Sequence, residues 1–256
     1  MKLAALAAAL FAVAVGAGAC GSSTDADPGD ATLTIYVSAP LSGPGRADGQ
    51  AVAAGAREAL EDAGAEAGGF TIAAEYLDVA GRDEDQPPQQ RRGSASASGL
   101  RLTRFDPVTA AANARTATED STTLAYLGEL DSGASRTSVP ITNSAGILQV
   151  APGSGASDLV REETYNDEVP TDVQATGERT FAQLVPTYEP GQPVPRREFA
   201  DLGYEAMASV LAAIDRASDP ADRGSVVDAY FDGTERDSRL GRYRIADTGE
   251  FEAIGH

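Results

Sequence analysis

The stretch that decides the fold is "YLGELDSGASRTSVPITNSAGILQVAP", Tyr126 to Pro152. It contains an apolar run, a small polar loop with Ser132 and Ser135, a segment long enough for a helix, and a second apolar run. A strand, a helix and a strand in this order form the unit from which parallel sheets are built. Ser132 is either a nucleophile or one of several hydroxyl groups that line a small-molecule site.

The composition disfavours a nucleophile. The single histidine, His256, is the last residue, and Lys2 is the only lysine. A Ser-His-acid relay needs an imidazole that its neighbours hold in place, and chain ends usually fray. No acidic pair stands out for hydrolysis by carboxylates alone. We therefore expect no catalytic residues, no cofactor and no enzymatic activity.

The N-terminus has the build of an export signal. Lys2 precedes an apolar core from Leu3 to Val15, and small residues then lead to Cys20. The apolar core is too short to span a bilayer. The sequence Ala-Gly-Ala-Cys that ends at Cys20 resembles a bacterial lipoprotein box, which implies an acylated cysteine. We predict a signal peptide at 1–19, a tether at 20–31, and an extracytoplasmic chain anchored to the membrane by lipid. The alternative is an ordinary secretory signal with an incidental cysteine.

The charge narrows the partners. The chain has 20 basic and 39 acidic residues, a formal net charge of −19. Nucleic-acid binding begins with clustered positive charge, so we expect no nucleic-acid partner. The acidic cluster at 83–85 lacks the glycine and the spaced oxygens of a calcium loop, so we expect no metal site. The acidic surplus is interpreted as a source of solubility.

Strand-like and helix-like segments alternate along most of the chain. Apolar and β-branched runs predict strands at 32–38, 70–78, 123–128 and 147–152, and helical periodicity or capping signals predict helices at 50–64, 107–120 and 133–146. Asp106 is predicted to cap the helix that begins with Pro107. This alternation implies an α/β fold in which a parallel sheet is flanked by helices.

Two segments interrupt that order. Residues 81–104 are rich in charge, Pro, Gly and Ser and are predicted to be a flexible insertion. Residues 184–198 hold four prolines. Beyond them we predict a helix with an apolar stripe, a second helix that starts at Pro220, and a final strand at 241–247. The stripe is formed by Met207, Val210, Leu211 and Ile214.

These pieces resemble the leucine/isoleucine/valine-type substrate-binding proteins of ABC importers, which have the type I periplasmic-binding fold. The resembling stretches are "VSAPLSGPGRADGQAVAAGAREALEDAG", the opening stretch, "VPTDVQA", and "FADLGYEAMASVLAAIDRAS" with "GRYRIADTGEF". Their order and spacing cover most of the chain after the tether. The resemblance implies a small polar ligand, an amino acid or a relative, that is delivered to an ABC permease.

The resemblance also implies a binding site. In open parallel sheets, ligands lie beyond the carboxyl ends of the strands, and loop amides at a helix N-terminus suit a carboxylate. Ser132 and the loop of Gly153, Ser154 and Gly155 match residues that hold the amino acid's polar groups in the family. Asp48 in the first loop is the third expected contact. The family often has Thr at position 155 and an aromatic residue at position 48. The alternative is that Ser132 and Ser154 only cap helices.

The family's two lobes are joined at a hinge, and most of the second lobe is missing here. "VPTDVQA" resembles the first crossing and "VPTYEPG" the return, and only "TGERTFAQL" lies between them. We therefore predict a first lobe at 32–168, a hinge remnant and Pro-rich linker at 169–198, and C-terminal helices and a strand at 199–256 that complete this lobe.

Three functions stay open. The first is a lipid-anchored solute-binding protein of an ABC importer. The second is a surface lipoprotein of the same fold that senses or binds a protein, or a degenerate short form that no longer serves transport. The third is an enzyme, which the shortage of His, Cys and Lys disfavours. Thermal stabilisation by a ligand separates the first from the second.

Overall fold

A six-stranded sheet forms the centre of the molecule. The computed structural model describes residues 31–80, 105–160, 180–187 and 198–255. The strands lie in the order β2-β3-β1-β4-β5-β6. Their bounds are Thr32–Ala39 (β1), Glu66–Ala67 (β2), Phe70–Asp78 (β3), Thr123–Leu127 (β4), Leu148–Ala151 (β5) and Phe181–Gln183 (β6). Every neighbouring pair is parallel except the short β2–β3 pair. The predicted α/β fold with a parallel sheet is confirmed.

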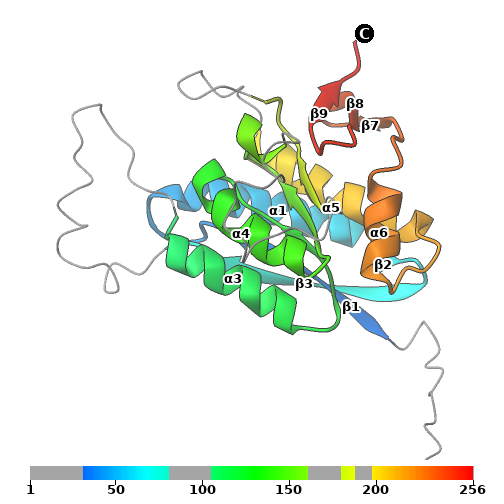
Figure 1. The fold of residues 1–256 in the computed structure, drawn as a ribbon, viewed down its shortest axis with the longest axis horizontal. Coiled ribbons are helices and arrows are strands. Elements are labelled where there is room, and N and C mark those ends of the chain that lie inside the picture. Colours follow the sequence, from blue (N-terminus) through cyan, green and yellow to red (C-terminus); the bar gives the residue numbers. More distant parts are fainter. Residues whose placement is uncertain (1–30, 81–104, 161–179, 188–197, 256) are drawn as a thin grey trace, which may run out of the picture.

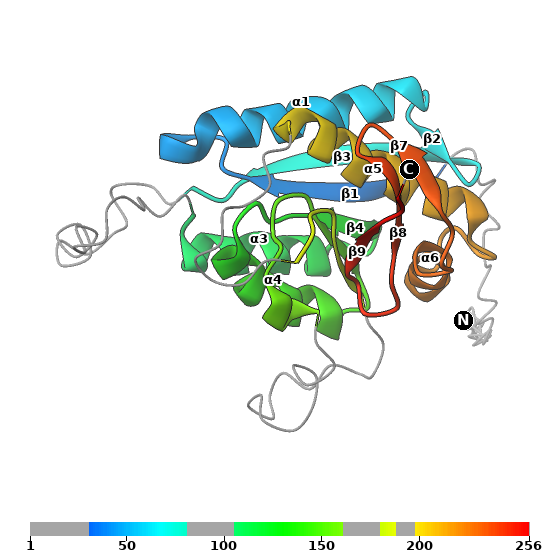
Figure 2. The same cartoon turned by 90° about the horizontal axis from the view of Figure 1, so that it is seen from above.

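Helices cover both faces of this sheet (Figures 1 and 2). One face carries α1 (Arg46–Asp62), α5 (Phe199–Arg216) and α6 (Arg223–Tyr230), and the other carries α3 (Pro107–Glu119) and α4 (Ser132–Ser144). Two short 3₁₀ turns, η2 (Gly43–Gly45) and η3 (Ser157–Leu159), follow β1 and β5. The described residues therefore form a single α/β lobe, with the C-terminal helices as part of it.

Capping residues determine where two of the helices begin. The Asp106 side chain accepts the backbone N–H of Thr109 at 2.9 Å, as expected for the cap of α3. In α6 the cap is Asp222, which accepts the N–H of Ser225 at 2.8 Å, so this helix begins at Arg223 and not at Pro220 as predicted. An aspartate at the N-cap satisfies a helical N–H that proline cannot, and this contact determines the start.

The α1–α5 pair closes one face of the sheet by a very near approach of the two backbones. A Cβ atom on Gly55 would lie 1.9 Å from the carbonyl oxygen of Ala200, and one on Gly203 would lie 2.1 Å from that of Val52. Only glycine leaves room for such a contact. The predicted apolar stripe of α5 is buried in this layer, which confirms it: Met207, Val210, Leu211 and Ile214.

A small antiparallel sheet follows the helices. It consists of β7 (Arg236–Ser238), β8 (Gly241–Ile245) and β9 (Phe251–Ala253). The strand predicted at 241–247 is β8, which ends at Ile245 and is followed by β9, so it is not the final strand. The β8–β9 turn lies against β6, where the Gln183 N–H donates to the Gly249 carbonyl oxygen at 3.0 Å. The main sheet's edge is thereby partly paired.

Strand β6 lies in the range that was predicted to be a hinge remnant and linker, 169–198. It pairs in parallel with β5, so this range contributes one strand to the main sheet. Three residues are too few to show a strand periodicity in the sequence. The predicted hinge crossing at 169–175, the insertion at 81–104, and Cys20 with its tether through residue 30 lie outside the described residues.

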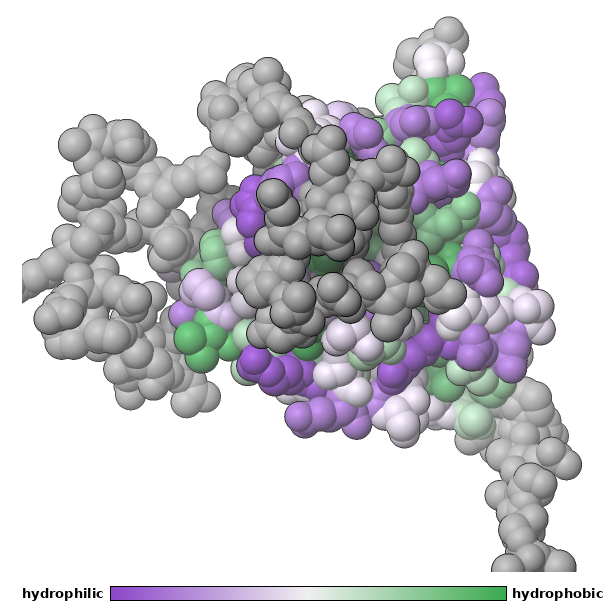
Figure 3. Space-filling view, viewed as in Figure 1, coloured by the Kyte–Doolittle hydropathy of each residue, from purple (hydrophilic) through white to green (hydrophobic). Residues whose placement is uncertain are grey.

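The outer surface mixes residue types. In Figure 3, hydrophilic and hydrophobic residues are interspersed in small groups over the coloured part of the face shown. Within the ranges that the structure describes, no helix is long and apolar enough to span a bilayer.

Candidate functional site

Three loops leave the sheet at one edge. The strand order runs outward in opposite directions from β1 and β4, which lie side by side in the middle of the sheet. The register pairs Val37 with Leu127 and Leu127 with Val150, so the carboxyl ends of β1, β4 and β5 are level. Such a topological switch point is where open α/β sheets bind their ligands.

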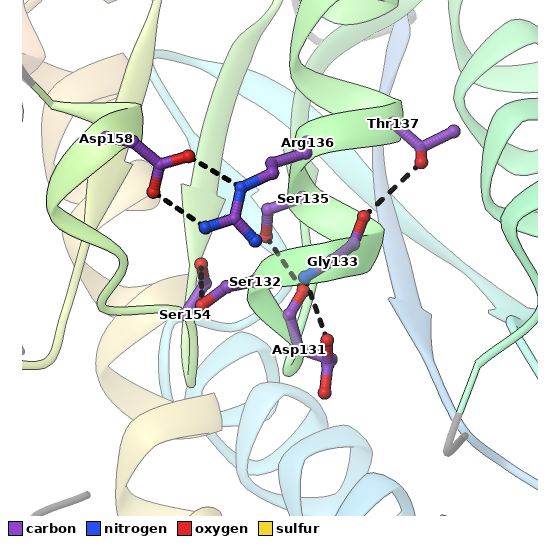
Figure 4. A network of polar contacts seen from close by, with 8 residues as sticks. All are labelled: Asp131, Ser132, Gly133, Ser135, Arg136, Thr137, Ser154 and Asp158. Atoms are coloured by element: carbon purple, nitrogen blue, oxygen red, sulfur yellow. Dashed lines mark hydrogen bonds and ion pairs between the residues drawn. The ribbon is translucent and has the colours of Figure 1, made fainter. Parts of the chain in front are cut away.

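Ser132 and Ser154 meet at this edge, although they belong to different loops (Figure 4). The Ser154 hydroxyl group donates a hydrogen bond to the Ser132 hydroxyl group at 3.2 Å. Ser154 is fully buried and Ser132 is partly buried. Gly153 lies directly against the β4 loop, since a Cβ atom there would be 2.9 Å from the Leu130 carbonyl oxygen. Gly155 is buried in the same loop.

The N-terminus of α4 forms one side of the site. Asp131 is its cap and accepts the N–H of Gly133 at 2.8 Å, so Ser132 is the first helical residue and not the cap. Capping therefore does not explain Ser132. The Ser135 hydroxyl group donates to the Asp131 carbonyl oxygen at 3.3 Å.

An ion pair forms a second link between the two loops. In Figure 4, Arg136 on α4 reaches Asp158 in η3, with distances of 2.6 Å from Nε and 2.7 Å from Nη2 to the two carboxylate oxygens. About half of each side chain is exposed. Sequence analysis did not find this pair, because no spacing rule connects two residues on separate loops.

Asp48 lies elsewhere than predicted. It is the third residue of α1 and not part of the loop after β1. That loop is held instead by Asp78, whose carboxylate accepts the N–H of Leu41 at 2.8 Å and that of Ala80 at 3.0 Å. The structure thus joins Ser132 and Ser154 but places Asp48 in a separate element. A ligand contact by any of these residues stays a prediction.

A buried polar cluster lies at the same edge, and sequence analysis missed it. Its centre is Glu129, which is fully buried and accepts hydrogen bonds from Tyr126 at 2.7 Å and from Ser38 at 3.0 Å. Asn113 donates to the Ser38 hydroxyl oxygen at 3.1 Å, and Gln149 donates to the Gly128 carbonyl oxygen at 2.9 Å. Burial is the main reason that the pKa of Glu129 is raised to about 7.

The available sequence signal for this cluster was weak. Glu129 directly follows an apolar strand, and a glutamate in that place is as compatible with a solvated loop as with a buried carboxyl group. In the part of the chain that the structure describes, no group of three or more His, Cys, Asp and Glu residues could hold a metal ion.

Comparison with known proteins identifies the fold. No protein-family model and no curated protein sequence matches the chain. Among solved structures, a protein from Rhodospirillum rubrum described as a branched-chain amino acid ABC transporter matches with a TM-score of 0.61 and 15% identity, over 88% of this chain and 96% of that chain.

Two further structures match with similar quality. The branched-chain amino acid transporter substrate-binding protein of Streptococcus pneumoniae, in complex with isoleucine, has a TM-score of 0.56 and 11% identity, with 88% of this chain and 97% of that chain covered. A solute-binding protein of an ABC transporter from R. palustris, in complex with benzoate, has a TM-score of 0.57 and 12% identity, with 86% and 91% covered. The fold is the type I periplasmic-binding fold. These neighbours are described as a transporter and as solute-binding proteins of transporters.

Proposed function

We propose that this chain is an extracytoplasmic solute-binding lipoprotein of an ABC importer and that it holds a small organic acid or amino acid at the loops after β4 and β5. The observation that carries the proposal is the 3.2 Å contact of Ser154 with Ser132 at the switch point of the sheet. Two hydroxyl groups beside the N-terminus of α4 suit a carboxylate. Isoleucine and benzoate, the ligands of two structural neighbours, share that group.

One lobe limits the affinity. Well-formed pockets cover roughly 70–90% of a small ligand's surface, whereas a single lobe presents one wall and water competes at the other side. We expect affinity nearer to millimolar than to micromolar, about −4 rather than −8 kcal/mol. Small-angle scattering is expected to show no large compaction when ligand is added, since hinge closure needs two lobes.

Calorimetric titration with leucine, isoleucine and benzoate tests the site. The Ser132→Ala variant is expected to weaken binding by about 1–3 kcal/mol, the value of a hydrogen bond to a charged group. Ser144→Ala is the matched control, because Ser144 ends the same helix, is exposed, and donates to the Ile141 carbonyl oxygen at 2.8 Å. Binding that Ser132→Ala leaves intact would place the ligand elsewhere, and no binding by any of the three compounds would favour the sensor or short-form alternative.

The lipid anchor is a separate part of the proposal. It is supported by the small residues that precede Cys20 and the polar tether that follows. A single acyl chain attaches a protein only marginally, so stable anchoring requires several chains. Cell fractionation of Cys20→Ser is expected to release the protein from membranes. Equal membrane association of the variant would refute the anchor and leave the binding site unaffected.

A further inference from the structure

Glu129 is a carboxyl group inside the fold where five elements meet. Its neighbours come from β1, β4 and α4, and a second layer comes from α3 and β5. The Gln149 amide of β5 connects the layers, since it also donates to the Ser138 hydroxyl oxygen on α4 at 2.8 Å. Apart from burial itself, the groups among the described residues that act on the Glu129 charge are three hydroxyl groups, which favour the charged form, and the carboxylate of Asp131, which disfavours it.

The segment that begins at Glu129 leads straight into the candidate site. Leu130 lies against Gly153, since a Cβ atom on that glycine would be 2.9 Å from the Leu130 carbonyl oxygen. Asp131 then caps α4, and Ser132 accepts the hydrogen bond from Ser154. Glu129 is thus three residues from Ser132, and the backbone between them forms the loop after β4 and contacts the loop after β5 at Gly153.

We propose that Glu129 is a positioning residue: its neutral carboxyl group holds the 129–132 segment against the Gly153–Gly155 loop, and its ionisation loosens that segment. The two carboxyl oxygens accept hydrogen bonds from Tyr126 and Ser38, which offset part of the cost of a buried charge but supply no positive partner. A buried carboxylate without a positive partner is costly. A charged Glu129 would gain hydration by moving toward the edge where the 129–132 segment leaves the sheet, and such a movement would separate Ser132 from Ser154.

The neighbouring charges act in the same direction. Tyr126 and Asp131 are the titratable groups that face Glu129, and Asp131 contributes a repulsive negative charge. Burial also raises the pKa of the Tyr126 hydroxyl group well above its usual value, so Tyr126 stays a donor. A ligand carboxylate would add another negative charge nearby. When Glu129 ionises, at a pH near its pKa of about 7, the contact between Ser132 and Ser154 is therefore expected to loosen. The affinity of the site for an anion is expected to decrease as well.

The geometric part can be tested without any ligand. Two proteins are compared, one with Glu129 and one with Glu129→Gln. Both also carry His256→Asn, which removes the only imidazole of the chain, a group that titrates in the same pH range. Backbone amide shifts of Ser132, Gly133 and Ser154 are followed by NMR from pH 5.5 to 8.5 with Glu129 or with Glu129→Gln. With Glu129, we expect one common transition near pH 7. With the glutamine, we expect flat shifts that resemble those of the low-pH state.

Two outcomes would overturn the positioning role: no transition at these amides, or the same transition in the Glu129→Gln protein. A second variant decides the case if the glutamine protein does not fold. Ser38→Ala removes one donor to the carboxylate, so the midpoint is expected to move to higher pH. An unchanged midpoint in Ser38→Ala also contradicts the proposal.

The effect on affinity rests on the proposed function, and benzoate is the probe because it stays ionised from pH 6 to 8. If only the neutral form of Glu129 is competent to bind, affinity at pH 8 is expected to be about tenfold weaker than at pH 6. Glu129→Gln is expected to abolish that difference. Benzoate binding with equal affinity at both pH values refutes the positioning role and retains the binding function. An amide transition in a protein that binds none of the compounds would retain the positioning role and refute the binding function.

Discussion

The two faces of the central sheet are built differently. On β1, alternate residues Ile35 and Val37 face α1 and α5 and join the main apolar cluster, whereas Tyr36 and Ser38 face α3 and α4. The same alternation recurs on β5, where Gln149 belongs to the polar cluster and its neighbours to the apolar one. One face is thus closed by helices in backbone contact, and the other encloses hydrogen-bonded polar groups.

The contacts that stabilise the fold and the candidate site therefore lie on different faces of the sheet. Apolar burial and near backbone approach stabilise the α1–α5 face. The buried carboxyl group of α5, Glu205, accepts a hydrogen bond from Tyr243 of the small sheet and lies away from the candidate site. The α3–α4 face includes the buried carboxyl group of Glu129 at the edge where the loops after β4 and β5 leave the sheet, and ionisation of this group costs free energy. Residues that lower stability are expected at functional sites. Here that residue is Glu129, which lies three positions before Ser132.

The largest expected effect is on the α1–α5 face. In Gly203→Ala, the new methyl group would meet the Val52 carbonyl oxygen at 2.1 Å, and no side-chain rotation can relieve a clash with backbone. The helices must separate, so we expect a loss of at least about 3 kcal/mol in the free energy of unfolding, measured in urea.

Gly224→Ala in α6 is the matched control for this substitution. Its nearest atom is a side-chain oxygen of Asp222 at 3.1 Å, so its effect is expected to stay within about 1 kcal/mol. If Gly203→Ala costs no more than Gly224→Ala, the α1–α5 contact adapts and the contrast between the two faces is weaker than described.

The second expected effect concerns the α3–α4 face and depends on pH. The pKa of Glu129 is about 7 in the folded chain against 4.5 for an unperturbed glutamate. Between these values the folded state keeps a proton that the unfolded state has released, so stability falls as pH rises through this window. Relative to Glu129→Gln, the free energy of unfolding should fall by about 2–3 kcal/mol between pH 4.5 and 8. Glu61→Gln, exposed on α1, is the control. An identical pH dependence in both variants would mean that Glu129 is not buried in solution.

The smallest effect on stability is expected when an exposed ion pair is removed. Two such pairs, one beside each face of the sheet, can be compared. Arg136→Gln removes the link between α4 and η3 and is expected to cost only about 0.2–1 kcal/mol of stability, as is usual for exposed pairs. The variant should nevertheless weaken benzoate binding, because the lost ion pair joins the two loops of the proposed site. Arg239→Gln, which removes the pair with Glu58 on α1, should leave that affinity unchanged. Equal affinities in both variants would show that the ion pair does not organise the site.

Much of the fold could be predicted because the strands are marked by apolar runs. The strands expected at 32–38 and 70–78 match β1 and β3 to within one residue. The meeting of Ser132 and Ser154 followed from one rule, that parallel strands end at the same edge. Those inferences need only the order of the segments, which a sequence contains directly.

The missed features depend on contacts between distant residues. Strand β6 is visible only through its pairing with β5, and the start of α6 only through the Asp222 side chain. Asp48 was placed in a loop because the preceding glycines and proline suggested a later helix start. Glu129 was missed because its burial depends on the direction in which one side chain points, and no periodicity encodes that direction.

The pairing of α1 with α5 also determines when the chain can fold. About 140 residues separate the last residue of α1 from the first of α5, so the apolar face of the sheet lacks α5 and α6 until residues 199–230 are available. Loop closure on this scale delays the formation of stabilising contacts, and folds dominated by distant contacts form slowly. A partial chain would expose the surface that these helices cover. Folding is therefore a late event that involves nearly the whole chain.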